Sequence, residues 1–346
     1  MKIIAHLDMD YFFAQIEERE NPDLKGRPVV IGADPKAGKG RGVVSTANYE
    51  ARKFGIHSAM PISWAYRACP EAVFLFPRHD FYSEVSHKIR NIIKKSLKRV
   101  VDAKLEQVSI DEFYLDISSI TDFKLAQEFL TDLKSKICKI EGLTCSVGLA
   151  TNKLLAKIAS GFKKPGGFTI ILQESAESFL FPLPVETLPG VGPKTKQALN
   201  RNGIKIIADL QKVSRTRLGE LFGKWGENIW ASCRGIDDSE VEERGERKTI
   251  GVQTTFERDT SNYYFLRRTL FDLCQQVWQD VQKEKLSPKT IEVTIRYFDF
   301  ETHSHQKTLK SPIADLYHFR QEAESLLKEI SKQKPVRLFG VRVGGW

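Results

Sequence analysis

The most informative stretch of the chain is VSIDEFYLDI, residues 108–117. Apolar and polar residues alternate on both sides of the acidic pair Asp111-Glu112, which is typical of two strands joined as a hairpin. Neighbouring side chains on a regular strand point to opposite faces, so both carboxylates reach one ion only at a tight turn. We therefore expect a hairpin centred on the acidic pair, which presents the two acids at the edge of a sheet.

A second acidic segment follows the apolar run at residues 2–7, which ends abruptly at Asp8-Met9-Asp10. Such a run predicts a buried strand whose end emerges at a functional edge. Clustered carboxylates repel one another unless cations neutralise them, and Mg²⁺ prefers oxygen ligands. Taken alone, these acids indicate either a magnesium site or ordinary turn caps and ion pairs, and strand periodicity pairs Asp8 with Asp10.

The first half of the chain mixes short strands with amphipathic helices, which indicates an α+β domain. In the first predicted helix, residues 11–20, we expect Glu17, Glu18 and Glu20 to face solvent. A Gly- and Lys-rich turn at residues 34–42 has no assigned role. Further helices are predicted at residues 81–101, 124–140 and 153–160, and strands at residues 28–32, 43–45 and 144–149.

The second half of the chain changes pattern twice. After residue 167 it is mainly helical up to about residue 236, which predicts a separate helical domain. Residues 237–248 are highly charged and predict a solvated linker. Beyond it, strands at residues 249–257, 290–298, 302–309 and 336–343 and helices at residues 263–283 and 313–331 have the β-α-β-β-α-β order of a ferredoxin-like unit.

Composition limits the class of partner. The 346 residues include 53 Lys+Arg and 44 Asp+Glu, a formal net charge of +9, and residues 244–346 alone hold 18 Lys+Arg and 13 Asp+Glu. An anionic partner is expected. No apolar run approaches the roughly 18 residues that cross a bilayer, the N-terminus lacks a signal-peptide pattern, and the five cysteines form no Cys-x-x-Cys pair. We expect a cytoplasmic protein with reduced thiols and no membrane partner.

Four segments resemble motifs of the Y-family translesion DNA polymerases, most closely of their polymerase IV branch. They are LDMDYFFA (residues 7–14), STANYEARKFG (45–55), MP (60–61) and SIDEFYLD (109–116), in the family's order and at compatible spacing. The resemblance extends over essentially the whole chain. It implies a multidomain α+β right-hand polymerase: a palm at residues 1–10 and 80–167, small fingers at 11–79, a helical thumb at 168–236, a linker at 237–246 and a ferredoxin-like little finger at 247–346.

The resemblance also implies an activity and a metal cofactor. The enzyme would add deoxynucleotides to a primer 3′ end by two-metal phosphoryl transfer, with low fidelity, in translesion synthesis and without a proofreading exonuclease. Two Mg²⁺ ions, with Mn²⁺ as a substitute, would be held by Asp8, Asp111, Glu112 and the backbone carbonyl of Met9. Asp10 is not a ligand by this resemblance, which overrides the pairing from strand periodicity.

The same resemblance assigns residues to the incoming nucleotide. Tyr49, Arg52 and Lys164 match positions that contact the triphosphate, where cationic and hydroxyl donors are needed. Phe13 matches the steric gate that excludes a ribose 2′-hydroxyl. Further donors are Thr46 and the backbone amides of Phe12 and Phe13.

Contacts with DNA are expected in two places. The segment LPGVGPKTKQAL, residues 188–199, resembles a helix-hairpin-helix, in which Gly190 and Gly192 allow close backbone approach to a phosphate. Lys194 and Lys196 add positive charge there. In the C-terminal unit we expect DNA contacts from Arg247, Lys248 and Arg296.

The expected partners are primer-template DNA and deoxynucleoside triphosphates, bound by a monomer. A sliding clamp is a further candidate, although the sequence ends at Trp346 without the short clamp-binding tail of many bacterial relatives. Two alternative functions use part of the pattern. A nucleotidyl cyclase needs the paired acids but not the helix-hairpin-helix, and a non-catalytic DNA-binding protein needs none of the three acids.

Overall fold

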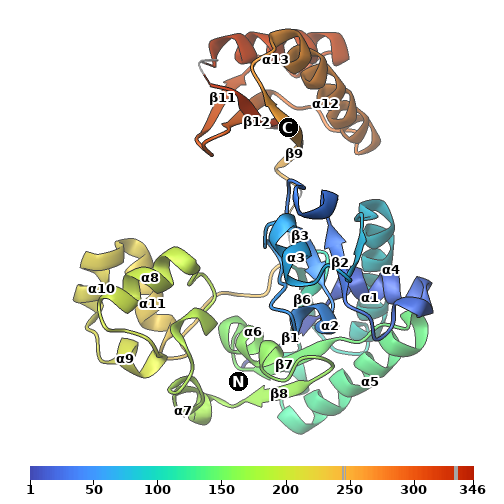
Figure 1. The fold of residues 1–346 in the computed structure, drawn as a ribbon. Coiled ribbons are helices and arrows are strands. Elements are labelled where there is room, and N and C mark those ends of the chain that lie inside the picture. The colour runs from blue at the N-terminus through green and yellow to red at the C-terminus, as the bar shows by residue number, and fades with distance from the viewer. Residues whose placement is uncertain (244, 246, 331–333) are drawn as a thin grey trace. The chain divides into compact units, whose positions relative to one another are not determined.

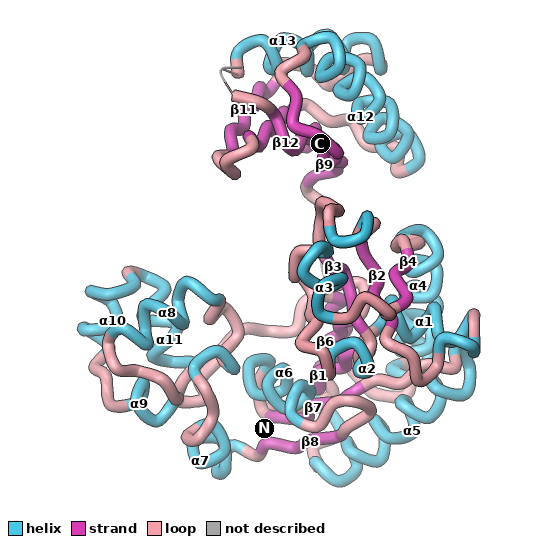
Figure 2. The backbone as a smooth tube through the Cα atoms, viewed as in Figure 1, coloured by secondary structure: helices cyan, strands magenta, loops and turns pink. Residues whose placement is uncertain are grey.

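The computed structural model describes residues 1–346 except positions 244, 246 and 331–333 (Figures 1 and 2). Two compact units are defined by their internal contacts. The N-terminal unit comprises Met1–Gly32, Val44–Met60 and Ala68–Arg244, and the C-terminal unit comprises Ala33–Val43, Pro61–Arg67 and Gly245–Trp346. None of the described helices is both long and apolar enough to cross a membrane.

A five-stranded sheet forms the centre of the N-terminal unit, in the order β5-β6-β1-β7-β8. Strand β1 is antiparallel to both neighbours, whereas β7 and β8 are parallel. Because side chains alternate along β1, Ala5 and Leu7 face one core while Ile4 belongs to the other. The strands are β1 Ile4–Asp8, β5 Lys104–Gln107, β6 Glu112–Asp116, β7 Ser146–Ala150 and β8 Phe168–Ile171.

Helices cover both faces of this sheet (Figure 1). α4 (His79–Leu97) and α5 (Phe123–Glu141) pack on the face of Ala5 and Leu7. α6 (Lys153–Phe162) packs on the opposite face. α6 begins where Asn152 accepts a hydrogen bond from the amide of Leu155, an N-cap that orients its first turn.

A small three-stranded sheet in the order β3-β2-β4 lies beside α1. The expectation that Glu17 and Glu18 face solvent is wrong, since both are buried. The hydroxyl of Tyr82 donates to Glu17 over 2.6 Å, and the amide of Asn48 donates to Glu18 over 2.7 Å. The elements are α1 Phe12–Glu20, β2 Val29–Gly32, β3 Val44–Ala47, α2 Tyr49–Arg52, α3 Ile62–Ala68 and β4 Val73–Leu75.

Short helices follow the sheet, but the predicted change of pattern after residue 167 is too early, because residues 168–171 form β8 of the five-stranded sheet, and the helices share one compact unit with that sheet. They pack around Leu188, Leu199, Leu218 and Ile229. α8 begins at Pro193, a residue suited to a first helical position because its missing N–H would have no partner there. The helices are α7 Ala176–Leu180, α8 Pro193–Arg201, α9 Ile207–Gln211, α10 Arg215–Phe222 and α11 Lys224–Ser232.

The expectation of a solvated linker holds only in part for residues 237–243: five of them are exposed, but the segment also contacts the N-terminal unit. Val241 is buried, with 1% of its surface exposed. The amide of Leu154 donates to Asp237 over 2.9 Å, and Glu240 pairs with Lys104. Residues 238–240, 242 and 243 nevertheless stay exposed, and the side chains of Glu240 and Glu243 are 57% and 67% exposed although each has a lysine partner. Positions 244 and 246 of the predicted linker, and position 331 of the predicted last helix, lie outside the described residues.

The C-terminal unit has the predicted β-α-β-β-α-β element order. Its sheet order is β11-β10-β12-β9, and β9 and β10 run in the same direction with β12 between them, a split β-α-β arrangement. Both helices pack on one face of the sheet (Figure 1). The elements are β9 Thr249–Thr260, α12 Tyr263–Lys283, β10 Thr290–Tyr297, β11 Thr302–Thr308, α13 Leu316–Glu329 and β12 Val336–Gly344.

The basic turn at residues 34–42 also belongs to the C-terminal unit. Arg41 donates to both oxygens of Asp259, over 2.5 and 3.0 Å, and to the backbone carbonyl of Phe256. Lys36 pairs with Glu257 over 2.6 Å. The turn thus has a structural role, which its Gly- and Lys-rich sequence did not reveal.

Candidate active site

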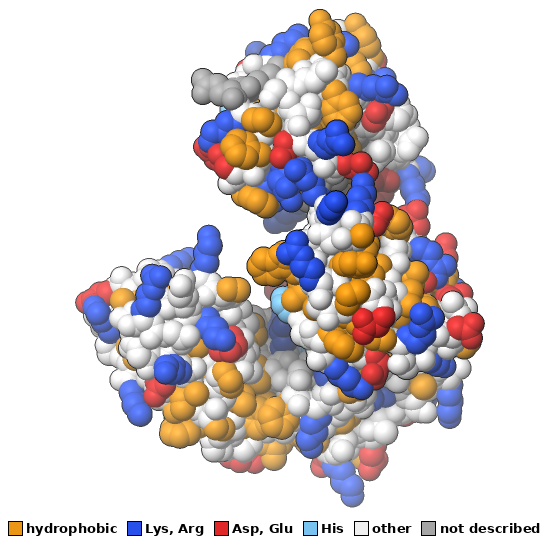
Figure 3. Space-filling model, in the orientation of Figure 1, with side chains coloured by type: hydrophobic (Ala, Val, Ile, Leu, Met, Phe, Trp, Pro, Cys, Tyr) orange, Lys and Arg blue, Asp and Glu red, His pale blue; other side chains and the backbone are white. Residues whose placement is uncertain are grey.

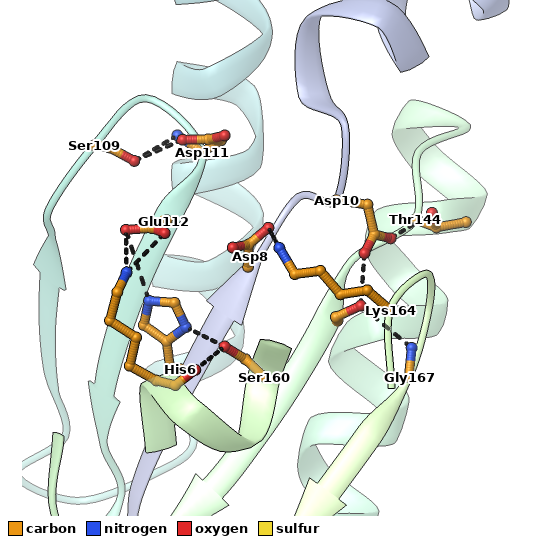
Figure 4. Close-up of polar contacts among 12 residues, drawn as sticks. His6, Asp8, Asp10, Ser109, Asp111, Glu112, Thr144, Ser160, Lys164 and Gly167 are labelled. Atoms are coloured by element: carbon orange, nitrogen blue, oxygen red, sulfur yellow. Dashed lines mark hydrogen bonds and ion pairs between the residues drawn. The ribbon is translucent and has the colours of Figure 1, made fainter. Parts of the chain in front are cut away.

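Three acids meet at one edge of the five-stranded sheet (Figure 4). Asp8 ends β1 directly opposite Glu112, which begins β6. Asp111 immediately precedes β6, and its backbone carbonyl accepts a hydrogen bond from the amide of Met9 over 3.0 Å. Pairing of β1 with β6 therefore brings together acids that lie about a hundred residues apart in the chain.

The predicted hairpin is displaced by a few residues. Its first strand is β5, which ends at Gln107, so the turn spans residues 108–111 and the acidic pair lies at the start of β6. The hydroxyl of Ser109 donates to Asp111 over 2.6 Å within this turn. The acids still reach the sheet edge, because the turn itself carries Asp111 and the first strand residue is Glu112.

Two lysines neutralise two of the acids. Lys164 Nζ lies 2.5 Å from Asp8 Oδ1. Lys157 Nζ, from α6, donates to both carboxylate oxygens of Glu112 over 2.8 Å. Among the residues described, no three carboxylate, imidazole or thiol groups are already gathered as a set of metal ligands. Each acid instead has a separate donor.

Burial dominates the electrostatics of the acids. It raises the pKa of Asp8 to about 6, against the opposing effect of Lys164, and the charges of Asp111 and Glu112 raise it further. Burial also raises the pKa of Asp111. The shift arises because a low-dielectric surrounding disfavours the charged carboxylate. Additional positive charge at this edge would therefore stabilise the ionised acids.

Asp10 has a different environment from Asp8. Its backbone has a left-handed φ of 45°, and its side chain is buried. Its carboxylate accepts hydrogen bonds from the hydroxyls of Thr144 and Ser146 and from the amide of Gly166, over 2.9, 2.6 and 3.1 Å. Asp10 thereby anchors the loop that carries Lys164. Figure 4 shows it turned towards Thr144, away from Asp111 and Glu112.

Sequence reasoning missed two residues at this edge, Lys157 and His6. The buried His6 ring contacts Ser160 Oγ through Nδ1 over 2.7 Å. Its Nε2 lies 4.0 Å from Glu112 Oε2 and has no hydrogen-bond partner among the described residues. Burial, with the charges of Lys157 and Lys164, lowers the pKa of His6 well below its ordinary value. In the sequence, only the position of His6 two residues before Asp8, on the same predicted strand, indicated that it could lie near the acids.

The predicted triphosphate residues lie on neighbouring elements of the N-terminal unit. The Arg52 guanidinium lies over the Tyr49 ring, 4.8 Å from its centroid, and Arg52 Nε donates to the carbonyl of Ala47. Burial raises the pKa of Tyr49 to about 12, so its hydroxyl is a neutral donor. Thr46 is half-buried on β3.

Phe12 and Phe13 begin α1 but differ in environment. Phe12 is buried in the core, whereas Phe13 is half-buried. The Phe13 ring stacks on Tyr82 with centroids 4.3 Å apart and meets the edge of His79 at 6.1 Å. These contacts hold the ring in one orientation.

The segment that resembles a helix-hairpin-helix exposes its glycines. Gly190 has a φ of 90°, and Gly192 caps α8. Lys194 is exposed, whereas Lys196 pairs with Glu186 over 2.6 Å. A cleft of about 700 Å³ lies between this hairpin and α6, and Lys157 is one of its lining residues. The cleft is therefore bordered by α6 at Lys157, the residue that pairs with Glu112.

The basic residues predicted in the C-terminal unit are largely paired. Arg247 lies 2.9 Å from Glu284, and Arg296 Nε donates to Thr302 over 2.9 Å. Lys248 is exposed just before β9. Figure 3 shows Lys and Arg side chains interspersed with acids on the visible faces of both units.

Comparison with known proteins identifies the family. The model of the protein family described as "impB/mucB/samB family" matches residues 7–161. The model of that family's C-terminal domain matches residues 247–346. A third match, "DNA polymerase-iota, thumb domain", covers residues 186–237. The chain is 43% identical to DNA polymerase IV of Methanoculleus marisnigri, over 99% of this chain and 94% of that protein. The chain belongs to the Y family of DNA polymerases.

Other relatives agree. DNA polymerase IV of Streptococcus agalactiae is 40% identical over 99% of this chain and 92% of its own length. A chimeric Y-family DNA polymerase shares the fold with a TM-score of 0.88 and 31% identity, covering 99% of this chain and 98% of the other. An insertion ternary complex of Dbh DNA polymerase has a TM-score of 0.68 at 30% identity, with the same coverage.

These matches confirm several predictions. The chain is a DNA-directed DNA polymerase of low fidelity that acts in translesion synthesis, with a multidomain α+β polymerase fold. Its partners are DNA and nucleotide substrates, and its family depends on divalent metal.

Proposed function

We propose that Asp8, Asp111 and Glu112, with the backbone carbonyl of Met9, hold two Mg²⁺ ions for deoxynucleotide transfer. The observation that supports this is the convergence of three acids at one sheet edge, with burial raising the pKa values of Asp8 and Asp111. Hard carboxylate oxygens are suitable ligands for Mg²⁺ and for Mn²⁺. When bound, such ions activate the primer 3′-hydroxyl and neutralise the leaving pyrophosphate.

The chain's own cations would bind and orient the triphosphate. Lys164 would exchange Asp8 for a phosphate oxygen, since its single ammonium group already lies at the acidic edge. Arg52 and the neutral hydroxyl of Tyr49 supply further donors. Additional contacts would come from Thr46 and from the amides of Phe12 and Phe13, which lie in the first turn of α1, where backbone amides have no helical acceptor.

Phe13 would exclude ribonucleotides. Its ring is held between Tyr82 and His79, so it resists displacement by an extra hydroxyl. A rigid aromatic edge beside the sugar discriminates by steric exclusion and needs no hydrogen bond. The half-exposed position of Phe13, next to the buried Phe12, supports this role.

DNA would be bound mainly through its phosphates. The exposed Gly190 and Gly192 allow a phosphate to approach the start of α8, with Lys194 and Lys196 nearby. Arg247, Lys248 and Arg296 would add contacts from the C-terminal unit. Each phosphate contact would steepen the salt dependence of binding by about 0.9 in logarithmic slope. We further propose a monomer that works in the cytoplasm, with a sliding clamp as an additional partner.

The direct test is extension of a labelled primer by the purified full-length protein with Mg²⁺ and deoxynucleotides. We expect template-directed extension that stops when the metal is chelated. Cyclic nucleotide formation from a triphosphate without primer extension would instead favour a cyclase. DNA binding without any synthesis would favour a non-catalytic protein.

A further inference from the structure

Lys157 is placed by the fold against a proposed metal ligand. It lies on α6, and its Nζ donates to both oxygens of Glu112 over 2.8 Å. The side chains of Lys157 and Glu112 are 35% and 25% exposed, so solvent screens the pair only in part. An ammonium group bridging both oxygens occupies the lone pairs that a cation would use.

Ser160 connects the backbone of Lys157 to strand β1. The Ser160 hydroxyl donates to the backbone carbonyl of Lys157 over 2.8 Å. Ser160 also contacts Nδ1 of the buried His6, on the strand that ends at Asp8. Side-chain contacts thus connect the base of Lys157 to β1, and the ammonium group is held close to Glu112.

Lys157 and Lys164 differ in what they can do when metal arrives. Lys164 has a proposed second partner, the triphosphate, which enters together with metal. Lys157 has none among the proposed nucleotide contacts. It therefore stays beside Glu112 as a competitor of any cation that Glu112 binds.

We propose that Lys157 is a positioning residue and an internal counter-cation, which holds Glu112 in the metal-free enzyme and lowers the affinity of the acidic edge for divalent metal. The inference rests on the proposed function of Glu112. If the ion pair forms about nine-tenths of the time, the competent fraction is about a tenth and the apparent metal affinity is about tenfold lower. Metal would then bind well only together with the nucleotide, whose phosphates supply extra ligands.

The test measures Mn²⁺ binding to the full-length protein without DNA or nucleotide, from the loss of the free-ion electron paramagnetic resonance signal. Lys157→Met removes the charge and keeps the length of the side chain, and we expect about tenfold tighter binding. Lys157→Arg keeps a bidentate cation and should bind as the wild type does. The matched control is Lys153→Met, on the same helix, which breaks the Lys153–Glu106 pair.

A second readout is thermal stability, which needs no binding titration. Without metal, Lys157→Met should melt at a lower temperature than the wild type, because Glu112 loses its partner beside Asp111. Saturating Mn²⁺ should then raise the melting temperature more than in the wild type. If Lys157→Met does not fold, Lys157→Gln serves the same comparison.

The outcomes separate this inference from the proposed function. Unchanged Mn²⁺ affinity in Lys157→Met, or an equal gain in Lys153→Met, would overturn the role of Lys157 while leaving the metal ligands intact. Mn²⁺ binding that is equal in the wild type and in Asp111→Asn would overturn the proposed ligands themselves. Tighter binding in Lys157→Met alone, reversed in Lys157→Arg, supports the inference.

Discussion

Two aspartates of this enzyme each have a basic partner close by, yet their pKa values shift in opposite directions. Asp8 lies 2.5 Å from Lys164, and Asp259 lies 2.5 Å from Arg41. The pKa of Asp8 is raised to about 6, mainly by burial. The pKa of Asp259 is lowered, mainly by hydrogen bonds from Arg41. A close cation alone therefore does not decide how readily an acid ionises.

The difference lies in the surroundings of each pair. Arg41 satisfies both oxygens of Asp259, and that pair is self-contained. Asp8 shares its edge with Asp111 and Glu112, whose negative charges oppose its ionisation. A self-contained pair is suited to holding structure together, whereas an acidic cluster with too few cations is suited to binding more of them.

The largest expected effect concerns the acidic cluster of Asp8, Asp111 and Glu112, which we expect to be essential for primer extension. In Asp111→Ala we expect primer extension to slow by about a thousandfold, because the proposed metal sites lose a ligand. Single-turnover extension measures this loss. Asp132→Ala, which removes an exposed acid on α5, is the control and should extend normally. Near-normal extension by folded Asp111→Ala would contradict the site.

The second prediction concerns Phe13, which we propose excludes nucleotides that carry a ribose 2′-hydroxyl. In Phe13→Val we expect incorporation of ribonucleotides relative to deoxynucleotides to rise by about a hundredfold, the scale of discrimination by shape in a packed pocket. Competing incorporation of matched nucleotides measures the ratio. Phe54→Val, which changes an exposed aromatic residue, should leave it unchanged. Unaltered sugar selection in Phe13→Val would remove Phe13 from this role.

The sign of the Asp8 shift gives a stability test. Because the folded pKa is raised, ionised Asp8 costs stability as pH rises from about 4 through about 6. Asp8→Asn should therefore stabilise the metal-free protein by about 3 kcal/mol at pH 8 and by about half as much at pH 5. Urea unfolding with a chelator at both pH values measures this. Destabilisation at pH 8 would show that the Lys164 pair outweighs burial.

Asp259 should behave in the opposite way. Its folded pKa is lowered, so its contribution is present above the ordinary aspartate range and is lost as pH falls below about 4. Asp259→Asn should cost about 1 kcal/mol at neutral pH, the scale of a partly exposed bidentate pair. Thermal unfolding checks this, and Arg41→Gln combined with Asp259→Asn should add little further loss. Strict additivity of the two changes would argue against a direct pair.

Particular residues show where sequence reasoning stopped. Periodicity located most strands and helices, because burial of one face leaves a pattern in the chain itself. It failed for Glu17 and Glu18, whose partners Tyr82 and Asn48 come from other elements. It was incomplete for residues 237–243, where Val241 is buried and the exposed Glu240 and Glu243 pair with Lys104 and Lys94. Glu17 and Glu18 looked solvent-facing because their partners are distant in sequence.

The sequence by itself determined the family, the order of elements and the acids expected at strand ends, because motifs and apolar periodicity are local properties of the chain. Only the tertiary structure decided which cations meet those acids. Lys157 lies 45 residues after Glu112 in the chain, and Lys164 pairs with Asp8 from the loop between α6 and β8. The energy of a charge depends on burial and on every nearby charge in space, and that sum exists only once the strands have paired.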